Sequence, residues 1–245
     1  MKIFLAGAGG VIGRRLTPLL RSAGHTVSGT TRAAEKAGAL RALGAEPIVV
    51  DVFDAQALAR AVLAAAPDVV LHQLTDLAFA PGTPQYEEGL ARNARLRIEG
   101  TRNLVAAAQA ASVKRMVAQS VAFAYAPSEG PRIESDPLNL HAEGAVGKSA
   151  EAVAALEQAV LSIPEGIVLR YGYFYGPGTW SGDVPSRQPS VHVDAAAQAA
   201  LIAVTRGERG IYNVAEDGGA VSSAKAKRDL GFDAGFRQVV HLKSM

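Results

Sequence analysis

The chain has 245 residues, of which 49% are hydrophobic and 20% are charged, with a formal net charge of +2. This composition suits a globular protein with one large α/β domain, or one domain and a small lobe. The weak charge, without a basic run, argues against nucleic-acid binding, and the absence of Cys excludes disulfides and thiolate metal sites. We find no signal peptide and no apolar stretch of about 18 residues, so we expect a cytoplasmic protein that does not enter a membrane.

Short apolar runs alternate with stretches of helical periodicity over residues 1–171. This alternation predicts an α/β fold with a doubly wound parallel sheet of at least six strands, covered by helices on both faces. Residues 75–84 and 120–144 are expected to form loops, and the second is long enough to be functional or mobile. The expected strands cover 3–6, 25–29, 47–50, 68–74, 115–119 and 166–170, and the expected helices cover 11–20, 34–43, 55–66, 86–111 and 147–161.

The alternation weakens after Tyr171, where residues 172–190 hold four Gly and three Pro. A helix over 195–205, a strand over 210–214 and a helix over 222–230 complete the expected elements. We therefore predict a dinucleotide-binding core over residues 1–171 and a small C-terminal substrate lobe over 172–245, interleaved with the core.

Three glycines at spacing three, Gly7, Gly10 and Gly13, follow the first predicted strand, and helical periodicity begins within them at Val11 and Ile12. A strand that turns on glycines into a helix aims the free N–H groups of the helix at the turn. These groups form an anion site suited to a dinucleotide pyrophosphate. The spacing is G-x-x-G-x-x-G rather than the G-x-G-x-x-G fingerprint, and the alternative is a tight turn with no ligand. We favour the cofactor site.

The end of the second predicted strand indicates which dinucleotide binds. A carboxylate about 20 residues past the glycines would bind a ribose 2′-hydroxyl and favour NAD. This chain instead has Thr31 and Arg32 there, and a guanidinium can pair with a 2′-phosphate. NADP is therefore the expected cofactor. NAD stays possible, because Arg32 could be an exposed residue that opens a helix, with Glu35 as a ribose ligand.

Eight stretches spread over most of the chain form one recognisable set of motifs. They are AGAGGVIG (6–13), DVFDAQAL (51–58), DVVLHQLT (68–75), GTRNLVAAA (100–108), RMVAQS (115–120), LRYGYFYGPGT (169–179), VHVDAAA (191–197) and IYNVAED (211–217). In this order they resemble the extended short-chain dehydrogenase/reductases, the NAD-dependent epimerase/dehydratase family, in an atypical and shortened form. The resemblance implies a doubly wound sheet with a small C-terminal substrate lobe.

The resemblance also implies roles for residues that flank the cofactor. Asp51 and Val52 would lie beside the adenine, with the Asp51 carboxylate accepting from its amino group. Leu74 and Thr75 would lie against the ribose and nicotinamide, and Tyr173 would lie beyond the nicotinamide. The ordinary alternatives are that Asp51 caps a strand end and that Tyr173 belongs to an aromatic core patch.

The family's usual chemistry needs a Tyr four residues before a Lys, together with a Ser after the fifth strand. Lys148 stands at the expected start of a helix and would bind the nicotinamide ribose, and Ser120 ends the fifth strand. Four residues before Lys148, however, the chain has Gly144. The general acid of the family is therefore missing from its usual place.

Three interpretations of this loss remain open. Tyr125, five residues past Ser120, could act as a substitute acid, or a later residue such as Tyr171 or Tyr175 could do so. The third interpretation is that the protein does not catalyse by this route. Tyr125 could equally pack as an aromatic residue in a loop, and Lys148 could be a solvated side chain at a helix start.

The remaining polar residues indicate structure rather than chemistry. His72, His141 and His192 lack the spacing of metal ligands, so we predict no metal site. His72 lies within an apolar strand and is expected to be a hydrogen-bonded core residue. Arg170 is expected to form a structural ion pair.

Two functions of different classes fit this sequence. The first is an NADP-dependent oxidoreductase acting on a small carbonyl or hydroxyl compound, with Ser120, Tyr125 and Lys148 as its catalytic candidates. The second is a non-catalytic NADP-binding sensor or regulator, because the family Tyr is lost and the C-terminal lobe is short.

The sequence also bears on partners. Only residues 180–190 separate GPGT from VHVD, so a small molecule is favoured over a sugar nucleotide, which needs a larger lobe. The predicted helices 86–111 and 147–161 resemble the pair through which members of the family dimerise. A homodimer is therefore possible.

Overall fold

A seven-stranded parallel sheet organises the molecule, with the strand order β3-β2-β1-β4-β5-β6-β9. The computed structural model describes residues 1–76 and 83–238. The doubly wound α/β class is confirmed, with one strand more than the minimum expected. The strands are β1 (Lys2–Ala6), β2 (Thr26–Thr31), β3 (Glu46–Val49), β4 (Val69–His72), β5 (Arg115–Val121), β6 (Glu165–Tyr171) and β9 (Gly210–Val214).

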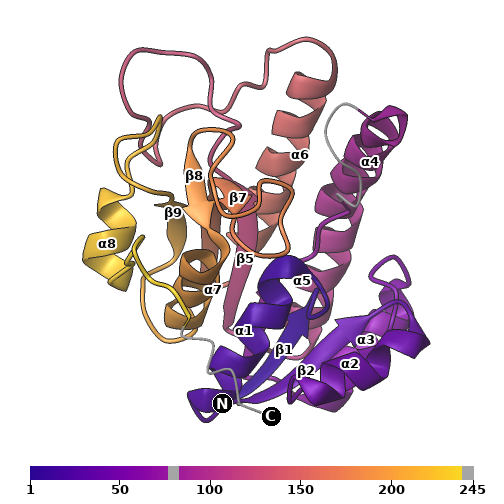
Figure 1. Cartoon of the computed structure of the whole chain (residues 1–245). Coiled ribbons are helices and arrows are strands. Elements are labelled where there is room, and N and C mark those ends of the chain that lie inside the picture. The colour runs from indigo at the N-terminus through magenta and orange to yellow at the C-terminus, as the bar shows by residue number, and fades with distance from the viewer. Residues whose placement is uncertain (77–82, 239–245) are drawn as a thin grey trace.

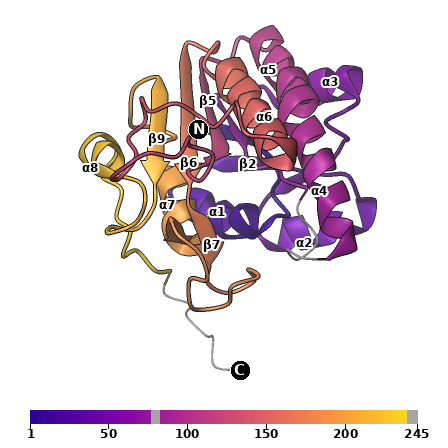
Figure 2. The same ribbon diagram turned by 90° about the horizontal axis from the view of Figure 1, so that it is seen from above.

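Helices cover both faces of this sheet, as the view from above shows (Figure 2). One face carries α1 (Val11–Ser22), α2 (Ala37–Ala42) and α7 (Val193–Ile202). The other carries α3 (Ala55–Ala65), α5 (Thr101–Ala110) and α6 (Gly144–Val160), with α4 (Pro84–Arg95) against α6. The short helix α8 (Ala224–Leu230) lies beside β9 at the sheet edge (Figure 1).

Alternation along the central strands divides the core into two layers. In β1, Ile3 and Leu5 pack toward α1 and α7, whereas Phe4 and Ala6 pack toward α3 and α5. A strand buried on both faces has a continuous apolar sequence rather than an alternating one, and the run after Lys2 has this composition. The strand order reverses between β1 and β4, so the crevice for a ligand lies at the carboxyl ends of these two strands.

The C-terminal part of the chain completes the core. Strand β9 pairs with β6, and α7 packs along α1. A second, two-stranded parallel sheet joins β7 (Tyr173–Tyr175) to β8 (Ser190–His192). Periodicity cannot predict these three-residue strands, because each is stabilised by a partner distant in sequence. The division at residue 172 into core and lobe stays a prediction.

Several predicted boundaries shift in the structure. The helix expected over 86–111 consists of α4, a π-helical turn (Leu96–Gly100) and α5 in direct succession. Helix α6 begins at Gly144, three residues earlier than expected, and Gly147 fits under the carbonyl of Ala142 where a Cβ would not. The helix expected over 34–43 is a 3-10 turn (Ala34–Lys36) followed by α2. Most of the loop expected over 75–84 lies outside the described residues.

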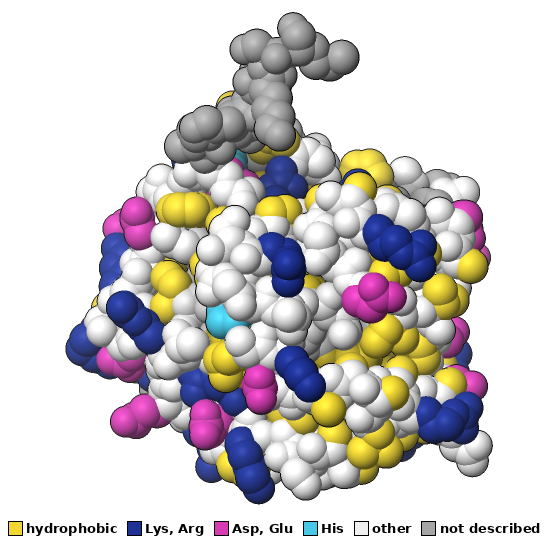
Figure 3. All heavy atoms as spheres, turned by 90° about the horizontal axis from the view of Figure 1, so that it is seen from below, with side chains coloured by type: hydrophobic (Ala, Val, Ile, Leu, Met, Phe, Trp, Pro, Cys, Tyr) yellow, Lys and Arg dark blue, Asp and Glu magenta, His cyan; other side chains and the backbone are white. Residues whose placement is uncertain are grey.

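The surface carries mixed charge on the face seen from below (Figure 3). Lys and Arg side chains are interspersed there with Asp and Glu rather than gathered into one basic area. Within residues 1–76 and 83–238, no helix has the length and apolar character needed to cross a membrane.

His72 ends β4 and is a core residue, as the sequence predicts. Its side chain is 1% exposed. One ring nitrogen, Nδ1, accepts from the Leu74 N–H at 3.3 Å, so Nε2 donates to Thr101 Oγ1 at 2.8 Å. Burial, together with the nearby charge of Arg97, lowers the pKa of His72 to about 4. The folded protein therefore contains neutral His72.

This depressed pKa predicts acid sensitivity. The unfolded chain takes up a proton near pH 6.5, whereas folded His72 does so only near pH 4. Stability is therefore lost as pH falls through this window. Between pH 7 and pH 5, wild type should lose about 2 kcal/mol more free energy of unfolding than His72→Gln, measured by urea titration. Equal losses in the two proteins would contradict a neutral buried His72.

Candidate functional site

The turn between β1 and α1 depends on two glycines. Gly7 has φ +93°, and a Cβ there would lie 2.5 Å from the carbonyl oxygen of Gln73 after β4. A Cβ on Gly13 would overlap the backbone of Gly7 and Ala8. Any larger residue would therefore separate α1 from the sheet or reshape the turn. These glycines hold the start of α1 over the carboxyl ends of β1 and β4.

The start of α1 is open to a ligand. Gly10 is exposed and is the N-cap residue, so no capping side chain satisfies the first N–H groups of the helix, which are those of Val11, Ile12 and Gly13. The first turn has no acidic residue that would repel an anion. A dinucleotide pyrophosphate matches this cradle in charge and in its need for N–H donors. The residues present therefore fit the predicted cofactor.

The end of β2 lies beside this turn. Thr30 Oγ1 accepts from the Gly7 N–H at 3.2 Å, and Thr31 Oγ1 accepts from the Ala33 N–H at 3.1 Å. The next side chain, Arg32, is exposed. The structure thus brings Arg32 to the carboxyl edge of the strand next to β1, where an adenosine ribose follows from a pyrophosphate on α1.

The other cofactor candidates occupy the same edge. Asp51 is exposed after β3, and its carboxylate accepts from the Phe53 N–H at 3.0 Å. Val52 is buried, and its carbonyl accepts from Asn103 Nδ2 at 3.0 Å. Leu74, half-buried, and Thr75, exposed, follow β4. Their contacts with adenine and nicotinamide stay predictions.

Ser120 faces the helix side of β5. Its hydroxyl donates to Glu157 Oε1 of α6 at 2.7 Å, and both residues are buried. Arg170, which pairs with Ser120 in the register of β5 and β6, reaches the same carboxylate through Nε at 2.8 Å and Nη2 at 2.6 Å. Burial by itself lowers the pKa of Arg170, but its bonds to Glu157 outweigh this effect and raise it. Arg170 thus forms the structural ion pair that the sequence predicts, and the Ser120 proton is committed to this pair.

Tyr125 is fixed in a structural cluster. Its hydroxyl donates to Asn213 Oδ1 of β9 at 2.7 Å, and the Arg170 guanidinium lies 4.7 Å from its ring centre. Burial raises the pKa of Tyr125, and Arg170 offsets part of the effect. The phenol proton is therefore held by a protein acceptor and is not free for a substrate. Tyr125 also makes no hydrogen bond with Ser120 in this geometry.

The later tyrosines are also engaged. Tyr171 is buried, its hydroxyl donates to the Ala196 carbonyl at 3.2 Å, and burial raises its pKa. Tyr175 contacts Glu216 and accepts from Arg237 Nη2 at 2.8 Å. Neither phenol has a free hydroxyl for acid catalysis in this arrangement.

Helix α6 presents a different residue to the interior from the one expected. Lys148 is exposed, whereas the next residue, Ser149, accepts a hydrogen bond at 3.2 Å from Nη1 of buried Arg97. Ser149 lies two helical turns before Glu157, and these positions share one face of the helix. The inward polar group at the start of α6 is therefore Ser149. Sequence reasoning missed Arg97 and Ser149, because only the packing of two helices brings them together.

An aromatic surface lies beyond β5 and β6. The ring of Tyr173 stacks on Phe123 with 3.9 Å between ring centres and 5° between planes. The Arg187 guanidinium lies 5.6 Å from the Tyr173 ring centre. Burial raises the pKa of Tyr173, and Arg187 offsets part of the effect. A flat apolar substrate group would find complementary rings here.

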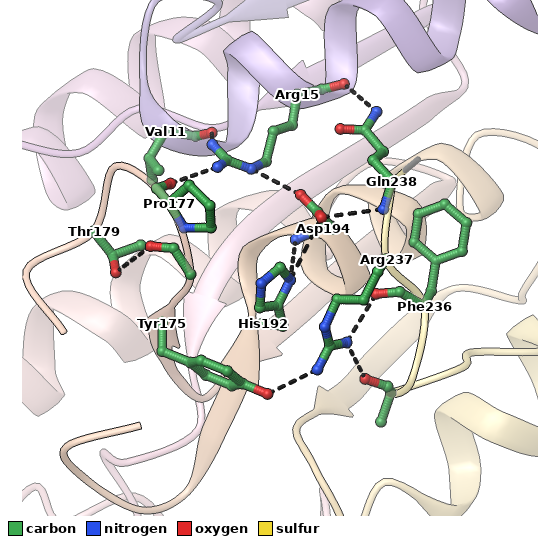
Figure 4. A network of polar contacts seen from close by, with 12 residues as sticks. Val11, Arg15, Tyr175, Pro177, Thr179, His192, Asp194, Phe236, Arg237 and Gln238 are labelled. Atoms are coloured by element: carbon green, nitrogen blue, oxygen red, sulfur yellow. Dashed lines mark hydrogen bonds and ion pairs between the residues drawn. The ribbon is translucent and has the colours of Figure 1, made fainter. Parts of the chain in front are cut away.

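A polar network ties the C-terminal segment to helix α1 (Figure 4). Arg15 of α1 pairs with Asp194 at 2.9 Å and also donates to the carbonyl of Pro177 in the loop after β7. Asp194 in turn accepts from the Gln238 N–H at 3.1 Å. Three segments distant in sequence therefore meet on one side of α1, and this contact fixes the loop that borders the crevice.

These features define a class of protein: a Rossmann-type dinucleotide-binding protein with its ligand crevice at the carboxyl edge of a parallel sheet. Residues 3–208 match the NAD dependent epimerase/dehydratase family, and the chain belongs to this family. The described residues contain no cluster of three or more side chains suited to a metal ion.

Individual relatives agree with this placement. Over 239 residues the chain is 41% identical to a 3-diazoavenalumate denitrifying reductase from a Streptomyces species, and the match covers 89% of this chain and 76% of that protein. The structure is similar to UDP-glucose 4-epimerase of Thermotoga maritima, solved with UDP-glucose (TM-score 0.77, 18% identity, 97% and 94% coverage). It also resembles the UDP-glucose 4-epimerase of Thermus thermophilus, solved with NAD (TM-score 0.72, 22% identity, 89% and 79% coverage).

The buried ion pair generates a stability prediction. In Glu157→Gln, the Arg170 guanidinium stays buried without its carboxylate, so the free energy of unfolding should fall by about 3–5 kcal/mol. Glu151→Gln changes an exposed residue of the same helix and should have little effect. Urea denaturation measures both variants. Similar stability of the two would show that Glu157 does not compensate Arg170.

Proposed function

We propose that the protein is an NADP-dependent reductase of small, activated electrophiles. The observation that carries this proposal is an open dinucleotide cradle beside which the hydroxyls of Ser120, Tyr125, Tyr171 and Tyr175 are all engaged with protein partners. By resemblance to the family, Gly144 would stand at the position of its Tyr, and the Tyr125 hydroxyl is held by Asn213. Such a site suits acceptors to which hydride can be transferred without help from a protein acid.

The chain's own residues would hold the cofactor along the carboxyl edge. The N–H groups after Gly10 would bind the pyrophosphate, Arg32 the 2′-phosphate and Asp51 the adenine amino group. Leu74 and Thr75 would lie beside the nicotinamide ribose. The reduced nicotinamide supplies a hydride. Phe123 and Tyr173 would exclude water from one side of the acceptor through their stacked rings.

The missing acid limits the choice of acceptor. General acid help is typically worth about 10²–10⁴-fold, so its absence slows reduction of an ordinary ketone, whose oxygen must be protonated. An electron-poor carbonyl needs less help, and water can provide the proton. A diazonium group needs none, because hydride and the cation together yield the arene and N₂. The relative that is a denitrifying reductase of a diazo compound supports this class of acceptor.

Cofactor choice is tested through Arg32. NADPH should bind more tightly than NADH, and Arg32→Ala should weaken NADPH by about 10–100-fold, because a charge-assisted contact with the 2′-phosphate is lost. NADH affinity should not change. Isothermal titration calorimetry measures both ligands, with Arg41→Ala, an exposed arginine of α2, as the matched control. Equal affinities of wild type for NADPH and NADH would overturn the NADP assignment.

Turnover is tested with three acceptors and NADPH: 4-carboxybenzenediazonium, 4-nitrobenzaldehyde and acetophenone. The first two should be reduced, and acetophenone should react at least about 100-fold more slowly. Products are measured by chromatography, with blanks that lack protein or contain Gly10→Val, whose side chain would occupy the cradle.

Two outcomes would contradict this acid-free reductase. In the first, Tyr125→Phe loses turnover by orders of magnitude while folding and NADPH affinity stay intact, so Tyr125 supplies the proton. In the second, NADPH binds tightly but no acceptor is reduced, which favours the non-catalytic sensor.

A further inference from the structure

Arg97 is a buried cation without a carboxylate partner. It lies in the π-helical turn between α4 and α5, and its side chain is 9% exposed. Within residues 1–76 and 83–238, no ion pair includes it, and the Nη1 bond to Ser149 Oγ at 3.2 Å is the one hydrogen bond of its guanidinium. Arginine carries five N–H donors, so most of them lack a protein acceptor. π-helical turns often mark functional sites.

The groups around Arg97 do not neutralise it. His72 is neutral, as its lowered pKa shows. Glu157 attracts Arg97 but is already bound by two nitrogens of Arg170 and by Ser120. Among the described residues, Arg97, Arg170 and Glu157 are the buried Lys, Arg, Asp or Glu side chains. The buried charges are therefore two guanidinium groups and one carboxylate, an excess of one positive charge.

The position of Arg97 in the fold brings this excess charge near the carboxyl edge of the sheet. Arg97 lies one helical turn before Thr101, which bonds His72 at the end of β4. Among the described residues, the side-chain atoms that are fully buried and have no hydrogen-bond partner belong to His25, Gln73 and Gln198, and none belongs to Arg97. The N–H groups of Arg97 that lack a partner must therefore reach solvent, and they can do so where the cofactor crevice lies.

Burial lowers the pKa of Arg97 to about 10, so the group still carries its charge near neutral pH. Burying a charge without a partner costs stability, and a planar guanidinium fork matches the two oxygens of a carboxylate. The Ser149 hydroxyl, which accepts from Arg97, has its own proton available to donate. A bound organic anion would satisfy both groups.

We propose that Arg97 and Ser149 form the carboxylate-binding end of the substrate site, so that the enzyme acts on small organic acids. This substrate class rests on the proposed reductase function. The carboxylate binds in the fork of Arg97 with a second bond from Ser149. The reactive part of the molecule extends from there into the crevice. Arg97, rather than the exposed Lys148, is the cation of the site.

Binding of a matched pair of probes tests this assignment without turnover. The NADP⁺-loaded protein is titrated by calorimetry with cinnamate and with cinnamide, which have the same shape but differ in charge. Wild type should prefer cinnamate by at least about tenfold. Arg97→Met should abolish the preference, Arg97→Lys should retain part of it, and Arg102→Met, an exposed arginine of α5, should retain all of it.

Thermal unfolding separates a binding role from a structural one. Arg97→Met removes a charge that lacks a partner, so its Tm should equal or exceed that of wild type, and its NADP⁺ affinity should be unchanged. A large fall in Tm would show a structural role and overturn the proposal. The proposal also fails if wild type does not prefer cinnamate, or if Arg97→Met keeps the preference. Carboxylate binding without reductase turnover would refute the proposed function alone.

Discussion

The carboxyl edge of the sheet depends on the contacts that the Glu157 carboxylate makes with Arg170 and Ser120. The carboxylate lies 2.6 Å from Arg170 Nη2 and 2.7 Å from Ser120 Oγ, so one side chain of α6 joins the ends of β5 and β6. A buried pair of this kind is costly to break, because a lone charge would stay behind. Because Ser120 and Arg170 are both bonded to Glu157, neither is free to bind a substrate. The positive charge of Arg97 is left without a carboxylate partner.

The same edge combines two different kinds of recognition. At α1, backbone N–H groups and the helix dipole favour an anion without any charged side chain, and glycines make the close approach possible. At α6 and the π-helical turn, a buried side-chain cation beside neutral His72 serves instead. The first arrangement suits a cofactor shared across a family. The second can differ between members, because it depends on single side chains.

The proposed reductase and the proposed carboxylate site make complementary demands on the substrate. In the proposed reductase, Gly144 stands where the resemblance places the family's Tyr, and the hydroxyl of Tyr125 is held by Asn213. Substrate orientation must then come from another part of the molecule, and the rings of Phe123 and Tyr173 together with the Arg97 guanidinium offer it. For an activated acceptor, correct placement relative to the hydride donor matters more to the rate of hydride transfer than protonation does.

The sequence by itself determined the alternation of strands and helices, the doubly wound class and the glycine turn at Gly7, because these follow from local periodicity and backbone freedom. It also indicated that His72 and Arg170 are structural. The tertiary structure decided the chemistry. Sequence spacing places Lys148 and Ser149 side by side, yet the packing of α6 turns only Ser149 inward, and it brings Glu157 to Ser120. Which side chains meet depends on helix rotation and strand register, which no short motif encodes.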